Sequence, residues 1–289
     1  KDTTIYANEI TYFKNDEKTY ARGNSKAVND NNTITATNLE YDKINNIFKA
    51  EENVVVTDLE KDTTIYANEI TYFKNDEKFF TKGKTKALIE KKYKFNSENV
   101  SYFRNSEDIF SQKKSSLEDE SGNIYKLDSF SYNINKELLT GQNVTVLAKV
   151  EENKEEKKID QYFFPEGFFN FKDKSHIANE TKIKIHKDVF GDENQDPRIY
   201  GSSSLSDQNK TVVNNGIFTS CKINDDCPPW SIKAEKITHD KIKKDMIYKN
   251  AILKVYDVPV LYFPKFFHPD PSVKRRSGFL QPQFNNSET

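Results

Sequence analysis

KDTTIYANEITYFKNDEK occupies residues 1–18 of the chain and returns without a single change at residues 61–78. Within each copy, apolar residues alternate with polar ones over short runs, which is the pattern of a half-buried β-strand. Self-similarity at a fixed distance is the signature of a repeat architecture.

The period is about thirty residues. Its marker is a tyrosine with an aliphatic or aromatic residue two positions before it, and successive marker tyrosines lie 29, 31, 30 and 30 residues apart. The sixty-residue copy is therefore two steps of a shorter repeat, and most simply a duplication of a two-unit block. The five marker pairs are Ile10/Tyr12, Leu39/Tyr41, Ile70/Tyr72, Val100/Tyr102 and Phe130/Tyr132.

The strand alternation slips by one residue at the same place in four successive units. In the first unit Ile5 and Ala7 are odd-numbered, whereas Ile10 and Tyr12 are even-numbered. This predicts one inserted residue per unit, at Asn8-Glu9 in the first. An inserted residue forms a β-bulge, which bends the strand and returns its side chains to the same face. We expect strands that all bend at one place.

A polar turn such as KNDEK follows each marker tyrosine, and a second apolar segment follows the turn. Each unit is therefore predicted to be a hairpin of two long bent strands. Stacked hairpins bury one apolar face against their neighbours. The predicted fold is all-β: stacked antiparallel bent strands that form an open β-jelly-roll, or V-shaped solenoid.

The repeats also divide the chain. Residues 1–150 are predicted to be repeated hairpin units. Residues 151–198 lose the register and are predicted to be a degenerate repeat, with a long loop as the alternative. The template returns twice within residues 199–264, which are predicted to be the last units. The matching positions are Tyr200, Ser202, Leu205 and Asp207, then Ile232, Ala234, Ile237 and His239.

Composition excludes several function classes. Lys and Arg number 44 against 45 Asp and Glu, so no basic excess favours nucleic acid. The chain lacks a phosphate-binding loop, a nucleophile elbow and a distinct acid–base pair. We therefore expect no enzyme, no catalytic residues, no metal and no cofactor. The chain begins with Lys1 and has no long apolar run; we expect a fragment trimmed at both ends, without a transmembrane helix.

Two cysteines, Cys221 and Cys227, lie six residues apart. A zinc site needs four ligands at paired short spacings, which this segment lacks. The pattern favours an oxidising compartment and a disulfide, either between these two cysteines or with cysteines beyond residue 289. Two free thiols in a reducing compartment are the alternative.

The C-terminal part of the chain carries a resemblance to a known family. It runs from FTSC at residues 218–221 through WSIKA at 230–234 to residues 250–284. The most specific run is V-P-V-x-Y-x-P at residues 258–264, followed by RRSGFLQP at residues 275–282. These elements resemble the LptD (OstA) family of outer-membrane lipopolysaccharide-assembly proteins. In that family a periplasmic β-jelly-roll of LptA-like units precedes a transmembrane β-barrel, so residues 265–289 are expected to be the junction and the first strand of a truncated barrel.

The resemblance implies non-enzymatic transport of lipopolysaccharide and its insertion at the outer membrane of a Gram-negative bacterium. This region would lie in the periplasm, receive lipopolysaccharide from an LptA-like bridge and guide its acyl chains to the barrel, where an LptE-like plug lipoprotein would bind. The inward repeat residues then become candidates for the lipid lining, with a filled core as the alternative. These candidates are Ile5, Ile10, Tyr12, Leu39, Tyr41, Ile65, Ile70, Tyr72, Val100, Tyr102 and Phe130.

The resemblance also assigns residues near the C-terminus. Cys221 matches a jelly-roll cysteine that pairs with barrel cysteines in the family, whereas Cys227 departs from the pattern. Pro282 matches a proline in the first barrel strand, where it would remove one ladder hydrogen bond beside the barrel seam. A soluble LptA-like bridge and a structural cell-surface repeat protein remain alternatives. The expected junction and gate residues are Pro259, Pro264, Arg275, Arg276, Ser277, Gly278, Phe279 and Pro282.

Overall fold

The computed structural model describes residues 3–29, 32–60, 62–153, 156–186, 195–222, 229–269 and 273. Within these residues the chain is all-β, as predicted, with a single 3-10 turn at Lys74–Asp76. None of the described helical residues belongs to a helix long and apolar enough to cross a membrane.

The chain forms two compact units, Lys1–Val146 and Leu147–Thr289. Strand β14 (Leu138–Asn153) contains the boundary. The strands of the first unit are β1 (Thr4–Tyr6), β2 (Glu9–Phe13), β3 (Lys18–Val28), β4 (Asn32–Asp42), β5 (Ile47–Asp58), β6 (Thr63–Phe73), β7 (Lys78–Ile89), β8 (Tyr93–Glu98), β9 (Ser101–Phe103), β10 (Asp108–Ser111), β11 (Ser115–Glu118), β12 (Ile124–Leu127) and β13 (Ser129–Asn133).

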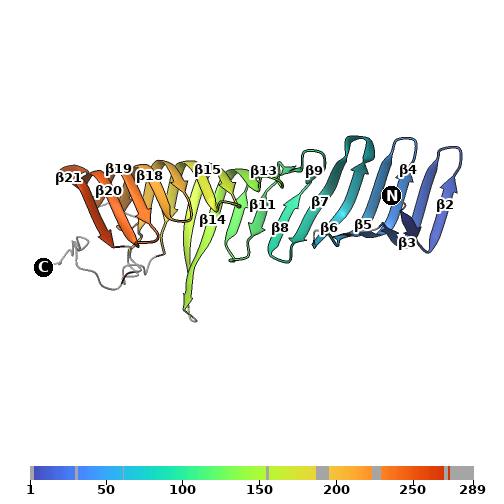
Figure 1. Cartoon of the computed structure of the whole chain (residues 1–289), viewed down its shortest axis with the longest axis horizontal. Helices are drawn as coiled ribbons and strands as arrows, with labels where there is room; N and C mark the ends of the chain where they lie inside the picture. The colour runs from blue at the N-terminus through green and yellow to red at the C-terminus, as the bar shows by residue number, and fades with distance from the viewer. Residues whose placement is uncertain are drawn as a thin grey trace. The chain divides into compact units, whose positions relative to one another are not determined.

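The described residues of the second unit form seven further strands after β14. They are β15 (Glu156–Asn170), β16 (Ser175–Lys184), β17 (Arg198–Ser206), β18 (Lys210–Thr219), β19 (Trp230–Asp240), β20 (Asp245–Val255) and β21 (Val258–Pro269). From β3 to β7 and from β15 to β21, strands that follow one another in sequence lie side by side as antiparallel neighbours (Figure 1). Between β7 and β14 the bent strands are divided into shorter ones, so that β7 pairs with both β8 and β9, and β10 pairs with β13. Such sequential pairing is what stacked hairpins require.

The polar turns end in a left-handed residue. Glu17, Asn46, Glu77, Glu107 and Glu137 have φ between 47° and 57°, and each immediately precedes the strand that leads back. A residue with positive φ reverses the chain tightly enough for the next strand to pair with the previous one. The predicted hairpins are confirmed at these positions.

The marker tyrosines form one cross-strand row, which confirms the repeat. Tyr41 pairs with Phe48, Phe48 with Tyr72 and Tyr72 with Phe79. Phe79 in turn pairs with Tyr102, and the row continues through Ile109 to Tyr132. The period of thirty is therefore the number of residues between a marker tyrosine and the tyrosine at the same place in the next hairpin.

The predicted phase slip is confirmed, but the inserted residue lies on the other strand. Ala36 and Leu39 are both buried although they are three residues apart, as are Ala67 and Ile70. At this point one residue of β6 faces two residues of β5 and two of β7. The prediction of an insertion at Asn8-Glu9 and its equivalents was therefore wrong, because the bulges belong to β3, β5 and β7.

Glycine permits the bulge where β3 bends. Gly23 has φ +73° and is followed by Asn24 with φ 49°, so two consecutive residues are left-handed. The Asn8 N–H donates to the Gly23 carbonyl at 2.9 Å. A Cβ atom on Gly23 would lie 2.8 Å from Nδ2 of Asn8. Glycine avoids both the strain of positive φ and this collision.

In the second unit, the alternation of buried residues shifts at the same place in neighbouring strands. The strand pairings from β15 to β20 therefore continue through the bend without a register shift. Ala234 and Ile237 on β19 are both buried, as predicted. On β17 the predicted phase was wrong by one residue, because Tyr200 and Leu205 are exposed whereas Ile199 and Ser204 are buried. Ile199, the apolar residue before Tyr200, is the one that turns inward.

The segment without clear register is also built of strands. Both aromatic runs that suggested strands, QYFF at residues 161–164 and GFFNF at 167–171, fall within or just at the end of β15. Phe164 is completely buried and Phe169 nearly so. Ala178 and Thr181 on β16 are buried three residues apart, so β16 has the same phase slip as the repeats.

Candidate apolar binding face

The inner face of the first unit has a buried row at the bend in which large and small residues alternate. Ile70, for example, pairs with Ala50 on one side and Thr81 on the other. A Cβ atom on Gly141, at the far end of the row, would lie 2.1 Å from Cδ2 of Leu127. This bend row begins at the exposed Ile10 and continues through buried residues, which are Ala21, Leu39, Ala50, Ile70, Thr81, Val100, Ser111, Phe130 and Gly141.

A partly buried row lies on each side of the bend. One is the tyrosine row described above. The other, which we call the isoleucine row, joins Ile34, Val56 and Ile65 through direct pairing. It continues through Ala87, Phe95, Leu117 and Tyr125. Apolar side chains therefore cover the inner face on both sides of the bend, and those away from the bend keep part of their surface accessible.

Hydroxyl groups replace alanine in the bend from β7 onward. Oγ1 of Thr81 lies 2.6 Å from Oγ1 of Thr85, and Oγ of Ser97 lies 2.8 Å from Oγ of Ser115. These buried hydroxyls satisfy one another, so they need no water. From β3 to β6 the bend is mainly apolar, and Ala21, Leu39, Ala50 and Ile70 belong to one core cluster. The buried Ser25 of β3 is the exception among the described residues of these strands at the bend, and its hydroxyl donates to the Thr37 carbonyl.

The phenol groups of the tyrosine row meet carboxylates in the turns. The Tyr72 hydroxyl donates to Glu77 at 2.9 Å, and the Tyr102 hydroxyl donates to Glu107 at 2.8 Å. Burial raises the pKa of both phenols, and the adjacent carboxylates raise it further. Burial likewise raises the pKa of Tyr132 to about 12. The phenols of Tyr72, Tyr102 and Tyr132 are therefore uncharged at neutral pH.

The predicted lining residues all lie on this face, but they differ in how deeply they are buried. Leu39, Ile70, Val100 and Phe130 are buried in the bend. Ile5, Tyr41, Ile65, Tyr72 and Tyr102 are partly buried. Ile10 and Tyr12 are exposed.

Sequence reasoning missed members of the face that lie on the second strand of each hairpin. Val56 pairs with Ile65, and Phe79 stacks on Tyr72 with ring centroids 4.2 Å apart. The alternation Val54-x-Val56 was a usable signal for β5. Phe79 was harder to assign, because Phe80 follows it directly and only the register with Tyr72 decides between them.

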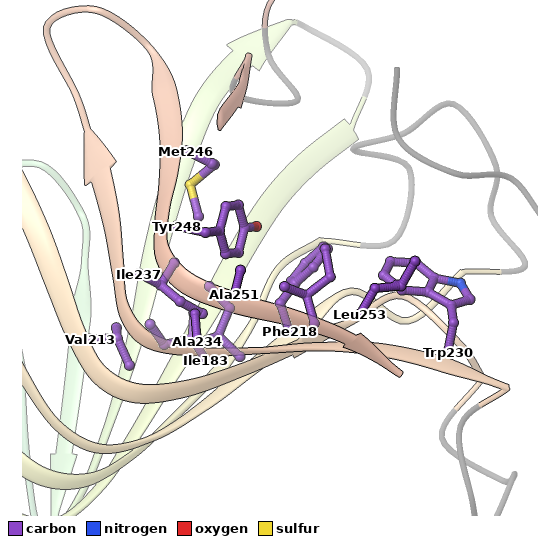
Figure 2. Close-up of a cluster of buried hydrophobic side chains, with 12 residues drawn as sticks. Ile183, Val213, Phe218, Trp230, Ala234, Ile237, Met246, Tyr248, Ala251 and Leu253 are labelled. Carbon is purple, nitrogen blue, oxygen red and sulfur yellow. The ribbon is translucent and has the colours of Figure 1, made fainter. Parts of the chain in front are cut away.

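The inner side of the second unit carries a cluster of buried hydrophobic residues. Figure 2 shows Met246, Tyr248, Ala251 and Leu253 of β20 beside Phe218 and Trp230, on the inner side of the bent strands. Tyr248 is fully buried, and its hydroxyl lies 3.0 Å from Nε2 of His268 on β21. Burial raises the pKa of Tyr248, which keeps the phenol protonated.

Cys221 is partly buried and forms no disulfide within the described residues, and its Sγ lies 3.7 Å from the Trp230 carbonyl. The buried Arg198 donates through Nη1 to the carbonyls of Asp196 and Cys221 and so holds the backbone there. Cys227 lies outside the described residues, so its pairing stays a prediction. In the part of the chain that the structure describes, no three His, Cys, Asp or Glu side chains come together as a metal site.

Of the predicted junction residues, Pro259 and Pro264 lie exposed on β21. The remaining ones, Arg275, Arg276, Ser277, Gly278, Phe279 and Pro282, lie outside the described residues, as does the expected first strand of a barrel.

No protein-family model matches the chain. Curated proteins do match part of it. The LPS-assembly protein LptD of Shewanella denitrificans is 36% identical over 95 residues, which is 32% of this chain and 12% of that protein. LptD of Sodalis glossinidius is 42% identical over 76 residues, 26% of this chain and 9% of that protein. Part of this chain is therefore similar to part of LptD.

The LptD-like chain spans about a tenth of the length of these relatives. LptD of Yersinia pestis is 40% identical over 79 residues, or 27% of the chain. Among solved structures, LptH of Pseudomonas aeruginosa, described as the LptA-homologous periplasmic component of a lipopolysaccharide transport device, aligns with a TM-score of 0.33. It is 15% identical and covers 35% of this chain and 76% of its own.

Proposed function

We propose that this chain is a periplasmic part of a lipopolysaccharide transport protein and that its inner face carries the acyl chains of the lipid. The observation that carries the proposal is the apolar face of the first unit, on which the tyrosine and isoleucine rows flank the bend. The similarity to LptD is the reason for naming lipopolysaccharide as the ligand. The proposed location is the outer membrane of a Gram-negative bacterium.

Burial decides which rows would meet lipid. The bend row is closed by the packing of large residues against small ones, so an acyl chain has no room there without displacing side chains. The isoleucine row keeps accessible apolar surface at Ile34, Val56 and Ile65. Transfer of an acyl chain between two such surfaces costs little, because each exchanges one apolar environment for another. No chemical step is needed.

The partners follow from the same proposal. A bridge protein similar to LptA would deliver the lipid, and a barrel beyond this region, with an LptE-like plug lipoprotein, would receive it. These assignments come from the likeness to LptD alone.

The test is photo-crosslinking in cells that make the full-length protein, with a photoreactive amino acid at Ile65 or at Tyr66. The two positions are adjacent on β6 and point to opposite faces, and Tyr66 is exposed. We expect lipopolysaccharide adducts at Ile65 and none at Tyr66. Adducts at neither position would show that the stack is structural, and equal adducts at both would show non-specific contact.

A further inference from the structure

The outer face of the second unit carries a row of exposed apolar side chains. Phe168 is 41% exposed, Ile177 56%, Leu205 46% and Phe267 56%. The residues before and after Leu205 in the chain are buried, so Leu205 points away from the inner face. Direct pairing of neighbouring strands from β15 to β21 joins the members of this outer row, which are Phe168, Ile177, Leu205, Val212, Thr238, Ile247 and Phe267.

The first unit shows that the fold does not require apolar residues at this place. Thr238 directly precedes His239, which holds the tyrosine position of the repeat. In the first unit the residue before each marker tyrosine is polar, so at least every second member of the corresponding row is polar. That row consists of Thr11, Tyr20, Glu40, Lys49, Thr71, Phe80, Ser101, Phe110, Ser131 and Thr140. The outer row of the second unit therefore calls for a reason other than folding.

A row of lysines lies directly beside the outer row, on the side of the bend. Lys236 pairs with Lys249, and Lys249 pairs with Lys265. All three side chains are exposed. Among the described residues, only Lys249 of these three has an ion pair, with Glu235 at 3.6 Å. Like charges directly opposite one another destabilise a sheet, so this lysine row favours an anionic partner outside the chain.

A lysine-rich turn lies on the other side of the outer row, between β19 and β20. Oδ1 of Asp240 accepts hydrogen bonds from the N–H groups of Ile242 and Lys243, at 3.1 and 2.9 Å, which fixes the turn. Ile242 is 72% exposed. Lys243 and Lys244 are exposed and form no ion pair within the described part of the chain. An apolar side chain is thus held out between unpaired positive charges.

The turn between β4 and β5 in the first unit is a matched comparison. It also begins Asp-Lys-Ile, and its Ile44 is 63% exposed. Asn45 and Asn46 follow in place of the two lysines, and Lys43 is paired with Glu17 at 2.6 Å. The two turns therefore share the exposed isoleucine, but differ in unpaired positive charge.

We propose that the outer face of the second unit, made of the outer row, the lysine row and the turn at Ile242, rests on the surface of a bilayer that contains anionic lipids. Apolar side chains would enter the boundary between headgroups and acyl chains, while lysines on both sides would meet lipid phosphates. Lysine suits this place, because its methylenes lie against apolar surface while its charge stays among the headgroups.

Charge favours a lipid surface over a second copy of the chain. Two copies joined through this face would bring their lysine rows together, and like charges across an interface oppose association. The inference concerns the outer face and does not rest on the proposed binding of acyl chains to the inner face. Vesicles without lipopolysaccharide test it separately.

Vesicle sedimentation of the purified chain is the first test. The chain should sediment with vesicles of phosphatidylcholine mixed with phosphatidylglycerol and remain in solution with phosphatidylcholine alone. Replacing both Lys243 and Lys244 by Gln should weaken binding by more than about tenfold, because each lysine near an anionic surface contributes about a factor of five. Leu205→Ser should also weaken it several-fold. Both changes affect exposed side chains, and circular dichroism checks that the β-structure is retained.

A fluorophore then locates the contact, in a background with Cys221→Ser and Cys227→Ser. Its emission at Ile242→Cys should shift to the blue when anionic vesicles are added, whereas the matched Ile44→Cys should not respond. Equal shifts at both positions would show non-specific adsorption through exposed apolar turns.

Three further outcomes would also overturn the proposal. The chain could fail to sediment with anionic vesicles, or sediment equally well after the lysine and Leu205 replacements, which would assign the binding to another surface. Analytical ultracentrifugation without vesicles could instead show a dimer that Leu205→Ser abolishes, which would assign the outer row to a second copy.

Discussion

At the residue scale, the partly buried His176 is expected to make the second unit sensitive to acid. Its ring lies 5.3 Å from Phe164 and 5.7 Å from Phe169, between ring centroids, and its Nε2 is buried without a hydrogen-bond partner. Burial, with a smaller contribution from the charge of Lys241, lowers the pKa of His176 from 6.5 to about 4. The folded state therefore holds the neutral ring, whereas the unfolded chain binds a proton below pH 6.5.

The sign of the pH effect follows. Because the unfolded state binds more protons between about pH 6.5 and 4, the free energy of unfolding should fall as the pH falls through that window. At pH 5 the loss attributable to His176 is roughly 2 kcal/mol, at about 1.4 kcal/mol per pKa unit. We expect His176→Phe to remove this part of the acid sensitivity, measured as the difference between urea unfolding curves of the two proteins at pH 7 and pH 5. Parallel losses in both proteins would contradict the assignment.

At the scale of the element, the two copies of the repeated strand should respond differently to the same substitution. Ile70→Ala removes a buried side chain between Ala50 and Thr81 and should cost roughly 2–4 kcal/mol of unfolding free energy. Ile10→Ala removes the same atoms from an exposed position and should cost less than about 1 kcal/mol. Urea unfolding of the two variants measures the difference. Equal losses would show that the strand edge at Ile10 is covered in solution.

The strands and hairpins could be predicted from the sequence where a pattern of neighbouring residues determines them. The tyrosine period, the hairpins and the phase slip are all properties of successive residues, and the structure confirms them. The position of the bulge could not be predicted, because a shift in the alternation of one strand can be matched by an extra residue in the neighbouring strand. Glu52 and Asn53 of β5, for example, lie opposite the single residue Asn68 of β6. On β17 the alternation fits both faces of the strand equally well, and only packing against β18 selects Ile199 as the inward residue.

At the scale of the whole molecule, the sequence predicted an apolar inner face but not how much of it is accessible. Four of the predicted lining residues, Leu39, Ile70, Val100 and Phe130, are closed by small partners on neighbouring strands. This closure is a cross-strand property, so a single strand does not reveal it. The accessible surface lies in the flanking rows, where Ile5 and Ile65 were predicted and Val56 was not. The C-terminal assignments rest on the likeness to LptD.

The central claim, that acyl chains bind the inner face, is tested most directly with the purified chain. A polarity-sensitive fluorophore is attached at Ile65→Cys or, as the matched control, at Tyr66→Cys, with Cys221 and Cys227 replaced by serine. Lipopolysaccharide should shift the emission at Ile65→Cys to the blue and leave Tyr66→Cys unchanged, and lipopolysaccharide stripped of its acyl chains should affect neither. No shift at Ile65→Cys, or an equal shift with the stripped molecule, would contradict the account.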